Sequence, residues 1–344
     1  MKWELIALHA ICLSEETHRR RRMNNAEQRP LVEVKNLKKY FEKKGQILHA
    51  VDDVNLKIMP GTTLGVVGES GCGKSTLGRT ILRLLKPTDG QIIFEGEDIT
   101  KVRESQMRKY RQSMQIIFQD PYSSLNPRKS VSEIIATPLV VNRMYKNKAE
   151  IQKRVKELMD TVGLAERLYY SYPHELDGGR RQRICIARAL AINPKFIVCD
   201  EPVSALDVSI QAQILNLLMD LQEDLGLTYM FITHDLSVVK HISTEIMVMY
   251  MGQCVEKASA RELFENPQHP YTKALLSAIP IPDISMRNKK LQVIRGEVTS
   301  PINPEPGCRF APRCDYCCDG CVGSQLPFTE ISENHFVSCR LMEK

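Results

Sequence analysis

The chain has 344 residues, 43% of them hydrophobic and 26% charged, which is enough to bury one large α/β core and a smaller appendage. Its formal net charge of +6 is modest, and basic residues are scattered among acidic ones, so the composition argues against a nucleic-acid partner. The longest apolar stretches, such as Ile246–Met251, are far shorter than the roughly 18 residues of a spanning helix. Any membrane role is therefore expected to be peripheral, with another subunit supplying the span.

The N-terminal residues combine an apolar segment, Trp3–Leu13, with the basic run Arg19–Arg22. A secretory signal places its positive charge before the apolar core and ends in small residues, and this segment does neither. We expect residues 1–30 to be a largely disordered extension, because the stretch from Met23 to Pro30 is polar. An upstream start codon and a membrane-surface helix remain open alternatives.

The next part of the chain is predicted to be rich in β-structure. Residues 31–37 and Ala50–Ile58 alternate apolar and polar side chains, which is typical of half-exposed antiparallel strands. Two further short strands are predicted at Gly90–Gly96 and at Met114–Phe118, the second of which ends at Gln119.

A phosphate loop lies between the apolar run Thr63–Val67 and a helical stretch that begins near Leu77. It fits the pattern GxxxxGK[ST] and consists of Gly68, Glu69, Ser70, Gly71, Cys72, Gly73, Lys74, Ser75 and Thr76. Glycines let consecutive backbone N–H groups curl around anionic phosphates, and the helix that follows adds a favourable dipole. We expect Lys74 to reach the β- and γ-phosphates and Ser75 to hold Mg²⁺. The flanking strand and helix disfavour a chance glycine-rich turn.

Residues from Val131 to Tyr170 have a helical pattern. Within this stretch, Glu150–Val162 is amphipathic and is followed by Gly163, a typical helix stop. Its apolar face consists of Ile151, Val155, Leu158, Met159 and Val162. We predict an inserted helical lobe over about residues 120–178.

Two buried-type strands, Lys195–Glu201 and Thr228–Asp235, flank a helix from Ile210 to Asp224, which is the βαβ rhythm of a wound sheet. Ligands of such sheets bind at the carboxyl ends of the strands.

Those carboxyl ends carry Asp200, Glu201 and His234. We expect Asp200 to bind Mg²⁺ through its water shell, Glu201 to deprotonate the attacking water, and His234 to polarise the γ-phosphate. Taken singly, an acid pair is more often a helix cap and a histidine more often structural. The phosphate loop favours the functional interpretation.

Together, these motifs resemble the ATP-binding-cassette (ABC) ATPase subunits. The resemblance adds a Q-loop glutamine at Gln119, a D-loop at Ser204–Asp207 and a signature region at Leu176–Arg183. It implies an α/β fold of the ABC-type P-loop NTPase class, with an antiparallel β subdomain, an inserted helical subdomain and a small Cys-rich C-terminal module.

The resemblance also implies roles for individual residues. Gln119 would act in catalysis and, with Ser75 and Asp200, bind Mg²⁺. An aromatic ring, Phe41 or else Tyr40, would stack on adenine. The remaining nucleotide contacts implied are Asp177, Gly178, Gly179 and Asp207.

Three segments are similar to the peptide-import branch of the family, the oligopeptide/dipeptide permease ATPases: Gln115–Pro127, Asn266–Leu276 and Gly307–Cys314. This similarity covers about residues 31–339. It implies an ABC ATPase domain at 31–265 and a peptide-importer C-terminal domain with a Cys cluster at 266–344.

The same resemblance implies the biochemical setting. The chain would be an ATP-hydrolysing subunit, with ATP and Mg²⁺ as cofactors, on the cytoplasmic face of the cell membrane. Its partners would be a homologous ATPase subunit, as a heterodimer or homodimer, two transmembrane permease subunits and an extracellular or periplasmic solute-binding protein. Nickel or glutathione as cargo, or a soluble ABC ATPase without transport, are the alternatives.

The signature departs from the family pattern LSGGQ, because it has Asp177 in place of serine and Arg180 in place of glutamine. A carboxylate facing phosphate is repelled unless Arg180 neutralises it, which would make the two ATP sites of a dimer unequal. The alternative is that Asp177 caps the following helix.

Six of the eleven cysteines lie in the last segment, and a reducing compartment disfavours disulfides between them. The spacing of Cys308, Cys314, Cys321 and Cys339 resembles the tail that holds a [4Fe–4S] cluster in some peptide importers. Cys317 and Cys318 are extra and could be alternative ligands. Zinc is less favoured because the spacing of these four cysteines lacks the tight C-x2-C pairs typical of zinc ribbons, and free structural cysteines remain an alternative.

Overall fold

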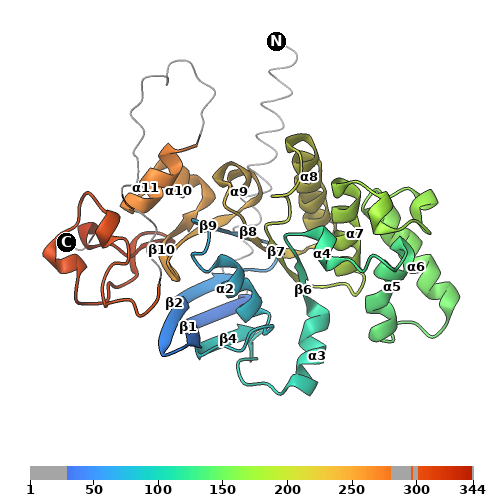
Figure 1. Ribbon diagram of the computed structural model, residues 1–344, viewed down its shortest axis with the longest axis horizontal. Helices are drawn as coiled ribbons and strands as arrows, with labels where there is room; N and C mark the ends of the chain where they lie inside the picture. The colour runs from blue at the N-terminus through green and yellow to red at the C-terminus, as the bar shows by residue number, and fades with distance from the viewer. Residues whose placement is uncertain (1–28, 280–295, 297–300, 343–344) are drawn as a thin grey trace, which may run out of the picture.

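The computed structural model describes residues 29–279, 296 and 301–342 (Figure 1). Nearly all of the predicted N-terminal extension, residues 1–30, lies outside them. None of the helices in the described part combines the length and the apolar character needed to cross a lipid bilayer.

The strands of the described residues form two sheets. The smaller sheet is antiparallel with the order β2-β1-β4-β5, and its strands are β1 (Val32–Lys43), β2 (Gln46–Ile58), β4 (Asp89–Phe94) and β5 (Glu97–Asp98). The larger sheet has the order β11-β12-β10-β9-β3-β8-β7-β6. Its strands are β3 (Thr63–Val67), β6 (Met114–Ile117), β7 (Phe196–Asp200), β8 (Thr228–Ile232), β9 (Glu245–Tyr250), β10 (Gln253–Ser259), β11 (Thr329–Ser332) and β12 (His335–Val337). Strands β9, β3, β8, β7 and β6 run parallel, and the other pairings are antiparallel.

Helices cover the larger sheet, and some of them form a separate group at one end of the molecule. They are α2 (Lys74–Ile81), α3 (Glu104–Ser113), α4 (Pro121–Ser124), α5 (Val131–Val141), α6 (Lys148–Thr161), α7 (Gly178–Leu190), α8 (Val208–Leu225), α9 (Leu236–Ile242), α10 (Ala260–Glu265) and α11 (Pro270–Ser277). Figure 1 shows α5, α6 and α7 at one end of the molecule and the C-terminal segment at the other.

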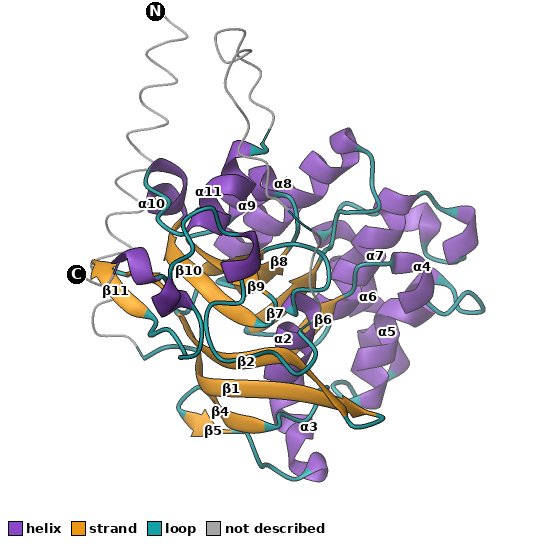
Figure 2. Ribbon diagram, turned by 60° about the vertical axis from the view of Figure 1, so that its left-hand side comes forward, coloured by secondary structure: helices purple, strands orange, loops and turns teal. Residues whose placement is uncertain are grey.

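The central parallel strands are buried on both faces, which explains their almost continuous apolar sequences. In β7, Phe196 and Val198 face the core shared with α2 and the antiparallel sheet. Their neighbours Ile197 and Cys199 face the core shared with α7, α8 and α9. The parallel strands are therefore covered on both faces, and Figure 2 shows α8 and α9 on one side of them and α2, β1 and β2 on the other.

The predicted strands and the amphipathic helix are confirmed, with shifts at their ends. In α6, Val155, Leu158 and Met159 are buried as predicted, and Gly163 (φ 66°) adopts the left-handed conformation just beyond the helix. The helix after the phosphate loop was placed wrongly, because it begins at Lys74 and not near Leu77. Gly73 (φ 102°) allows the loop to turn directly into α2.

A separate Cys-rich C-terminal module is not confirmed, because the tail adds strands to the larger sheet. Strand β12 pairs with β10, and residues 301–303 bond the edge of β2 through His49 N–H to Pro301 O and Asn303 N–H to Ile47 O. The domain boundary at residue 266 stays a prediction.

A buried carboxylate ties the tail to the sheet. The side chain of Glu256, in β10, accepts hydrogen bonds from the backbone N–H groups of Gln268 (2.7 Å) and His269 (3.0 Å) and from Nε2 of His335 (2.8 Å). Burial lowers the pKa of His335, but the hydrogen bonds and negative charges of Glu256 and Glu262 outweigh it and raise that pKa above 6.5. His335 thus links β12 to β10 most strongly when it is protonated.

We expect His335→Gln to destabilise the protein more at pH 6 than at pH 9. Because the pKa of His335 is raised on folding, its stabilising charge is fully present below the unfolded pKa and is lost as pH rises through the folded pKa. The loss at pH 6 should be about 1–3 kcal/mol, as for a hydrogen bond between charged groups. Urea unfolding at both pH values measures it, with His241→Gln on the exposed side of α9 as control. An equal loss at both pH values would contradict the assignment.

Candidate nucleotide site

The phosphate loop, Gly68–Thr76, connects β3 to α2 at the carboxyl edge of the parallel strands, and two of its glycines cannot be replaced without a clash. A Cβ atom on Gly68 (φ 148°) would lie 2.2 Å from the backbone oxygen of Met249. One on Gly73 (φ 102°) would lie 2.0 Å from that of Ala50. The loop is therefore held tightly against β9 and β2.

Lys74 is buried and folds back over the loop. Its Nζ donates to the backbone oxygens of Gly68 (2.8 Å) and Glu69 (2.9 Å). This places a positive charge on the loop whose N–H groups and helix N-terminus favour anions. The arrangement suits the polyphosphate of a nucleotide.

Ser75 and Asp200 lie side by side, as predicted for Mg²⁺ ligands. Ser75 Oγ donates to Asp200 Oδ1 (2.5 Å), and the Asp200 side chain is only 1% exposed. In the described residues no group of three or more His, Cys, Asp or Glu side chains is arranged to hold a metal. A hydroxyl and a carboxylate nevertheless fit Mg²⁺, which takes few protein ligands and completes its shell with phosphates and water.

Arg79, which no sequence motif predicted, is also part of the site. Its Nη2 lies 3.1 Å from Asp200 Oδ2, and almost half of its side chain is exposed. Arg79 follows Ser75 by four residues on α2, so helical spacing could have placed it on the same face. The guanidinium therefore balances the charge of the buried Asp200 carboxylate.

The three predicted catalytic residues lie together. Gln119 Nε2 donates to Glu201 Oε2 (2.8 Å), and His234 Nδ1 lies 3.4 Å from the same oxygen. Glu201 has a left-handed backbone (φ 49°), and its N–H donates to Ile232 O (2.9 Å) in β8. The carboxylate thus stands at the strand ends, where it can accept a proton, with an amide and an imidazole beside it to orient water.

The two candidate adenine-stacking rings differ in their surroundings. Tyr40 stacks on His49 with 3.9 Å between ring centroids, and its hydroxyl donates to Asp52. Phe41 is 37% exposed, with the Lys39 ammonium 4.7 Å from its ring centroid. The ring and hydroxyl of Tyr40 are therefore engaged by His49 and Asp52, whereas the ring of Phe41 is accessible to a ligand.

The signature residues lie beside the D-loop. Asp177 is the N-cap of α7: its Oδ1 accepts from the backbone N–H of Arg180 (2.8 Å), and its Oδ2 lies 3.4 Å from Arg180 Nε. The predicted cap is therefore present, with the exposed Arg180 guanidinium beside the carboxylate, and the inequality of the two ATP sites stays a prediction.

The signature glycines pack closely on the segment around Asp207, which is the N-cap residue of α8. A Cβ on Gly178 would lie 2.9 Å from Leu206 Cδ2, and one on Gly179 would lie 2.8 Å from Ile210 Cγ2. The structure thus places the signature with the D-loop and α8.

The tail cysteines do not form a metal site as they are arranged. The Sγ atoms of Cys318 and Cys321 are 3.6 Å apart, and Cys308 N–H donates to Cys321 O (2.8 Å). Burial raises the pKa of the Cys308 thiol to about 11, and Cys321, Cys339 and Cys314 add to the shift. The four predicted ligands are near neighbours, but the structure does not support the [4Fe–4S] prediction.

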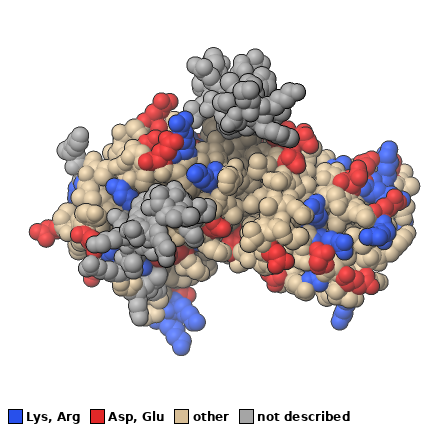
Figure 3. Space-filling model, turned by 90° about the horizontal axis from the view of Figure 1, so that it is seen from above, with Lys and Arg blue, Asp and Glu red and all other residues tan. Residues whose placement is uncertain are grey.

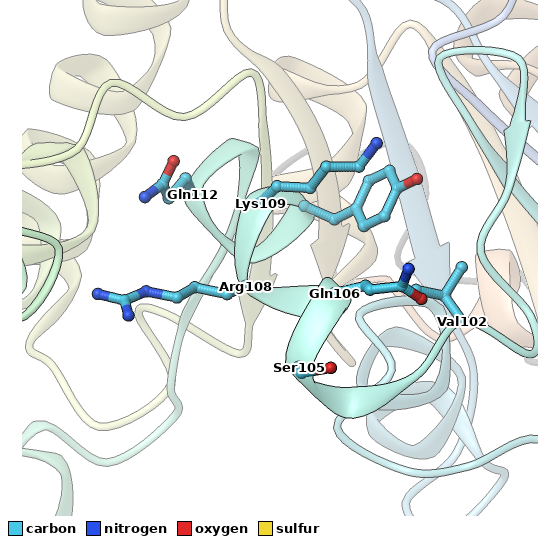
Figure 4. Close-up of a pocket in the computed structure, with 7 residues that line it drawn as sticks. Val102, Ser105, Gln106, Arg108, Lys109 and Gln112 are labelled. Carbon is cyan, nitrogen blue, oxygen red and sulfur yellow. The ribbon is translucent and has the colours of Figure 1, made fainter.

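A hollow of about 530 Å³ lies along α3, and Figure 4 shows side chains that line it. It is lined by Val102, Ser105, Gln106, Arg108, Lys109, Tyr110 and Gln112. None of the predicted site residues belongs to it, so it is not connected with the nucleotide site.

Two family descriptions match the chain. The description "ABC transporter" matches residues 51–204, and "Oligopeptide/dipeptide transporter, C-terminal region" matches residues 255–321.

Curated relatives match over most of their length. The chain is 51% identical to the oligopeptide transport ATP-binding protein OppF of Salmonella typhimurium, covering 89% of this chain and 92% of that protein. It is 48% identical to the oligopeptide transport ATP-binding protein AppF of Bacillus subtilis, covering 93% and 99%.

Solved structures share the fold. The ATP-binding cassette MJ0796, a dimer in a post-hydrolysis state bound to ADP and Pi, matches with a TM-score of 0.62 and 32% identity over 67% of this chain and 99% of that one. CbiO1 of Clostridium perfringens, part of the ABC transporter complex CbiONQ, matches with a TM-score of 0.63 and 30% identity over 70% and 92%.

We expect Asp177→Ala to lower the free energy of unfolding by about 0.5–2 kcal/mol, because α7 loses its N-cap. Asp177→Ser should stay within a few tenths of wild type, since serine caps about as well as aspartate. Urea unfolding of the three proteins measures both values. If serine and alanine cost the same, the cap does not stabilise the helix.

Proposed function

Since the chain belongs to the ATP-binding subunits of the oligopeptide and dipeptide ABC importers, we propose that its nucleotide site provides the energy for peptide uptake. The observation that carries this proposal is the grouping of the phosphate loop, the Ser75–Asp200 pair and the Glu201–Gln119–His234 cluster at one edge of the sheet.

The residues of this edge divide the work. The loop N–H groups and Lys74 bind the phosphates of ATP, and Phe41 stacks on the adenine. Ser75, Asp200 and Gln119 would hold Mg²⁺, which when bound would neutralise part of the phosphate charge. Glu201 accepts a proton from the attacking water at its Oε2 side, where Gln119 and His234 orient that water.

A second ATPase subunit completes the site. In this chain the signature lies against Leu206 and Ile210, so the phosphate loop needs a signature from a partner. The similar cassette MJ0796 is a dimer, which supports this arrangement. We propose a homologous partner, either a different subunit or a second copy.

The signature of this chain then acts on the partner's ATP. If the Asp177 carboxylate repels that ATP, Asp177→Ser raises the ATPase rate of the assembled complex. A role limited to capping leaves the rate unchanged.

Membrane and receptor partners follow from the same proposal. Large apolar side chains are exposed close to Gln119 in sequence and on the helical end, which supports docking of a permease subunit at the cytoplasmic face of the membrane. They are Tyr122, Val140, Val141 and Tyr170. Two permease subunits and an external solute-binding protein complete the importer. Figure 3 shows acidic and basic side chains intermixed on the face in view. This mixture does not suggest a nucleic-acid partner, and we propose none.

We expect Glu201→Gln to reduce ATP turnover of the assembled complex by at least about 100-fold, the typical contribution of a general base. Gln keeps the size of the side chain, so ATP should still bind and remain trapped. Turnover and retained nucleotide are measured on the complex in proteoliposomes. Glu166→Gln, an exposed surface carboxylate paired with Lys156, is the control. Unchanged turnover in Glu201→Gln would remove Glu201 from the catalytic role.

Cargo is tested by uptake in cells that lack this subunit. We expect loss of labelled di- and oligopeptide uptake, restored by the wild-type chain and not by Glu201→Gln. If peptide uptake is retained and nickel or glutathione uptake is lost, that solute is the cargo instead. If no uptake is impaired, the result favours an ATPase without a transport role.

The [4Fe–4S] cluster stays a proposal that rests on the sequence spacing of the four cysteines and on the 2.8 Å hydrogen bond from Cys308 N–H to Cys321 O. Anaerobically purified protein is expected to contain iron and acid-labile sulfide in nearly equal amounts. Cys308→Ser should lose both, whereas Cys317→Ser, an exposed thiol outside the four ligands, should retain them. Stoichiometric zinc or bare thiols would overturn the cluster.

A further inference from the structure

Two residues of the C-terminal region hold Glu69, the second residue of the phosphate loop. Arg313 donates from Nη1 to Glu69 Oε2 (2.9 Å) and from Nη2 to Oε1 (3.3 Å), a two-pronged ion pair. The hydroxyl of Tyr271, in α11, accepts the backbone N–H of Glu69 (2.9 Å). The loop is thus bound through both its side chain and its main chain.

Arg313 is itself held in place. Its side chain is 7% exposed, and Nη1 also donates to the hydroxyl of Tyr250 (3.3 Å) at the end of β9. The rings of Tyr250 and Tyr271 contact Phe310, with centroid distances of 5.3 and 5.4 Å. This packing fixes the turn Ala311–Arg313 against the loop, so the guanidinium meets Glu69 in a defined geometry.

A second arginine of the same short segment holds the other side of the site. Arg309, 5% exposed, donates to the Asp52 carboxylate and to Met251 O, and Asp52 also accepts from Tyr40. Burial raises the pKa of Asp52, but the Tyr40 hydrogen bond and the Arg309 charge outweigh it and keep that pKa below its usual value. Asp52 therefore stays charged and anchored beside the strand that carries Phe41.

The Arg313 guanidinium neutralises the negative charge of the Glu69 carboxylate. Glu69 follows Gly68 directly, so its carboxylate lies next to the loop that receives the negative phosphates. Without the guanidinium, the partly buried Glu69 carboxylate would repel the phosphates of ATP. The loop would also lose a contact that holds its conformation. With the guanidinium, the pair is neutral and the loop is braced before ATP arrives.

We propose that Arg313 is a positioning residue for ATP: the C-terminal region neutralises and braces the phosphate loop through Arg313 and Tyr271. This inference rests on the proposed function, since it requires ATP to bind at the loop. Because Arg313 binds Glu69 and Tyr250 and not the proposed base Glu201, it acts on ATP affinity more than on the chemical step.

The test compares ATP binding by the full chain with that of matched variants. Arg313→Gln should weaken MgATP binding about tenfold, the loss typical of a charge-assisted hydrogen-bonded pair. Arg313→Lys, which keeps the charge but not the fork, should lie between it and wild type. In the assembled complex KM for ATP should rise by a similar factor, while kcat at saturating ATP changes less than about threefold.

Rescue and control variants separate this role from general damage to the tail. Adding Glu69→Gln to Arg313→Gln should recover most of the lost affinity, because no unpaired carboxylate remains. The control is Arg340→Gln, whose guanidinium binds Gly320 O and Ser324 inside the tail. It should match wild type in MgATP affinity.

The inference is overturned if Arg313→Gln and Arg340→Gln bind ATP equally well, or if Glu69→Gln gives no rescue. If Arg313→Gln fails to fold, Arg313→Lys alone decides, and wild-type affinity in that variant overturns the inference. A wild-type chain that does not bind MgATP would overturn the proposed function itself, and the inference with it.

Discussion

The backbone of the phosphate loop is the constraint on which the rest of this structure depends. Its N–H groups can surround phosphates only if positions 68 and 73 are glycine. A Cβ added to Gly68 would lie 2.2 Å from a neighbouring carbonyl oxygen, and one added to Gly73 would lie 2.0 Å from another. A loop under that restriction needs rigid supports. It has them in the two-sided packing of the parallel strands, in the hydrogen bonds from Lys74 to its backbone oxygens, and in Arg313 and Tyr271, which bind Glu69.

The strand order β3-β8-β7-β6 brings the proposed catalytic residues together, because those residues follow the carboxyl ends of strands that are neighbours in the sheet. Ser75 reaches Asp200 from the loop, and Gln119 and His234 reach Glu201 from the strands on either side. Three pairs of opposite charge lie around the site: Arg79 with Asp200, Arg313 with Glu69 and Arg309 with Asp52. Partial burial makes these pairs matter, since an unpaired charge there would be costly.

The sequence predicted the local features of this site and few of the distant ones. Strands, the helix α6 and the loop have periodic or motif signals that depend on neighbouring residues. Arg313 and Glu69 are 244 positions apart, and the buried Glu256–His335 pair joins strands 79 positions apart, so no local pattern could reveal either. Phe41 and Tyr40 could not be ranked from sequence, because only the fold shows that Tyr40 is engaged by His49 and Asp52.

The central claim is that this chain carries a complete ATP-binding loop but only part of the machinery that turns ATP over. The direct measurement is the rate of ATP hydrolysis per chain, for the isolated subunit at concentrations where sedimentation shows a monomer and for the assembled complex. We expect the isolated subunit to bind MgATP and to hydrolyse it at least about tenfold more slowly than the complex. Equal rates per chain in the two states would contradict it.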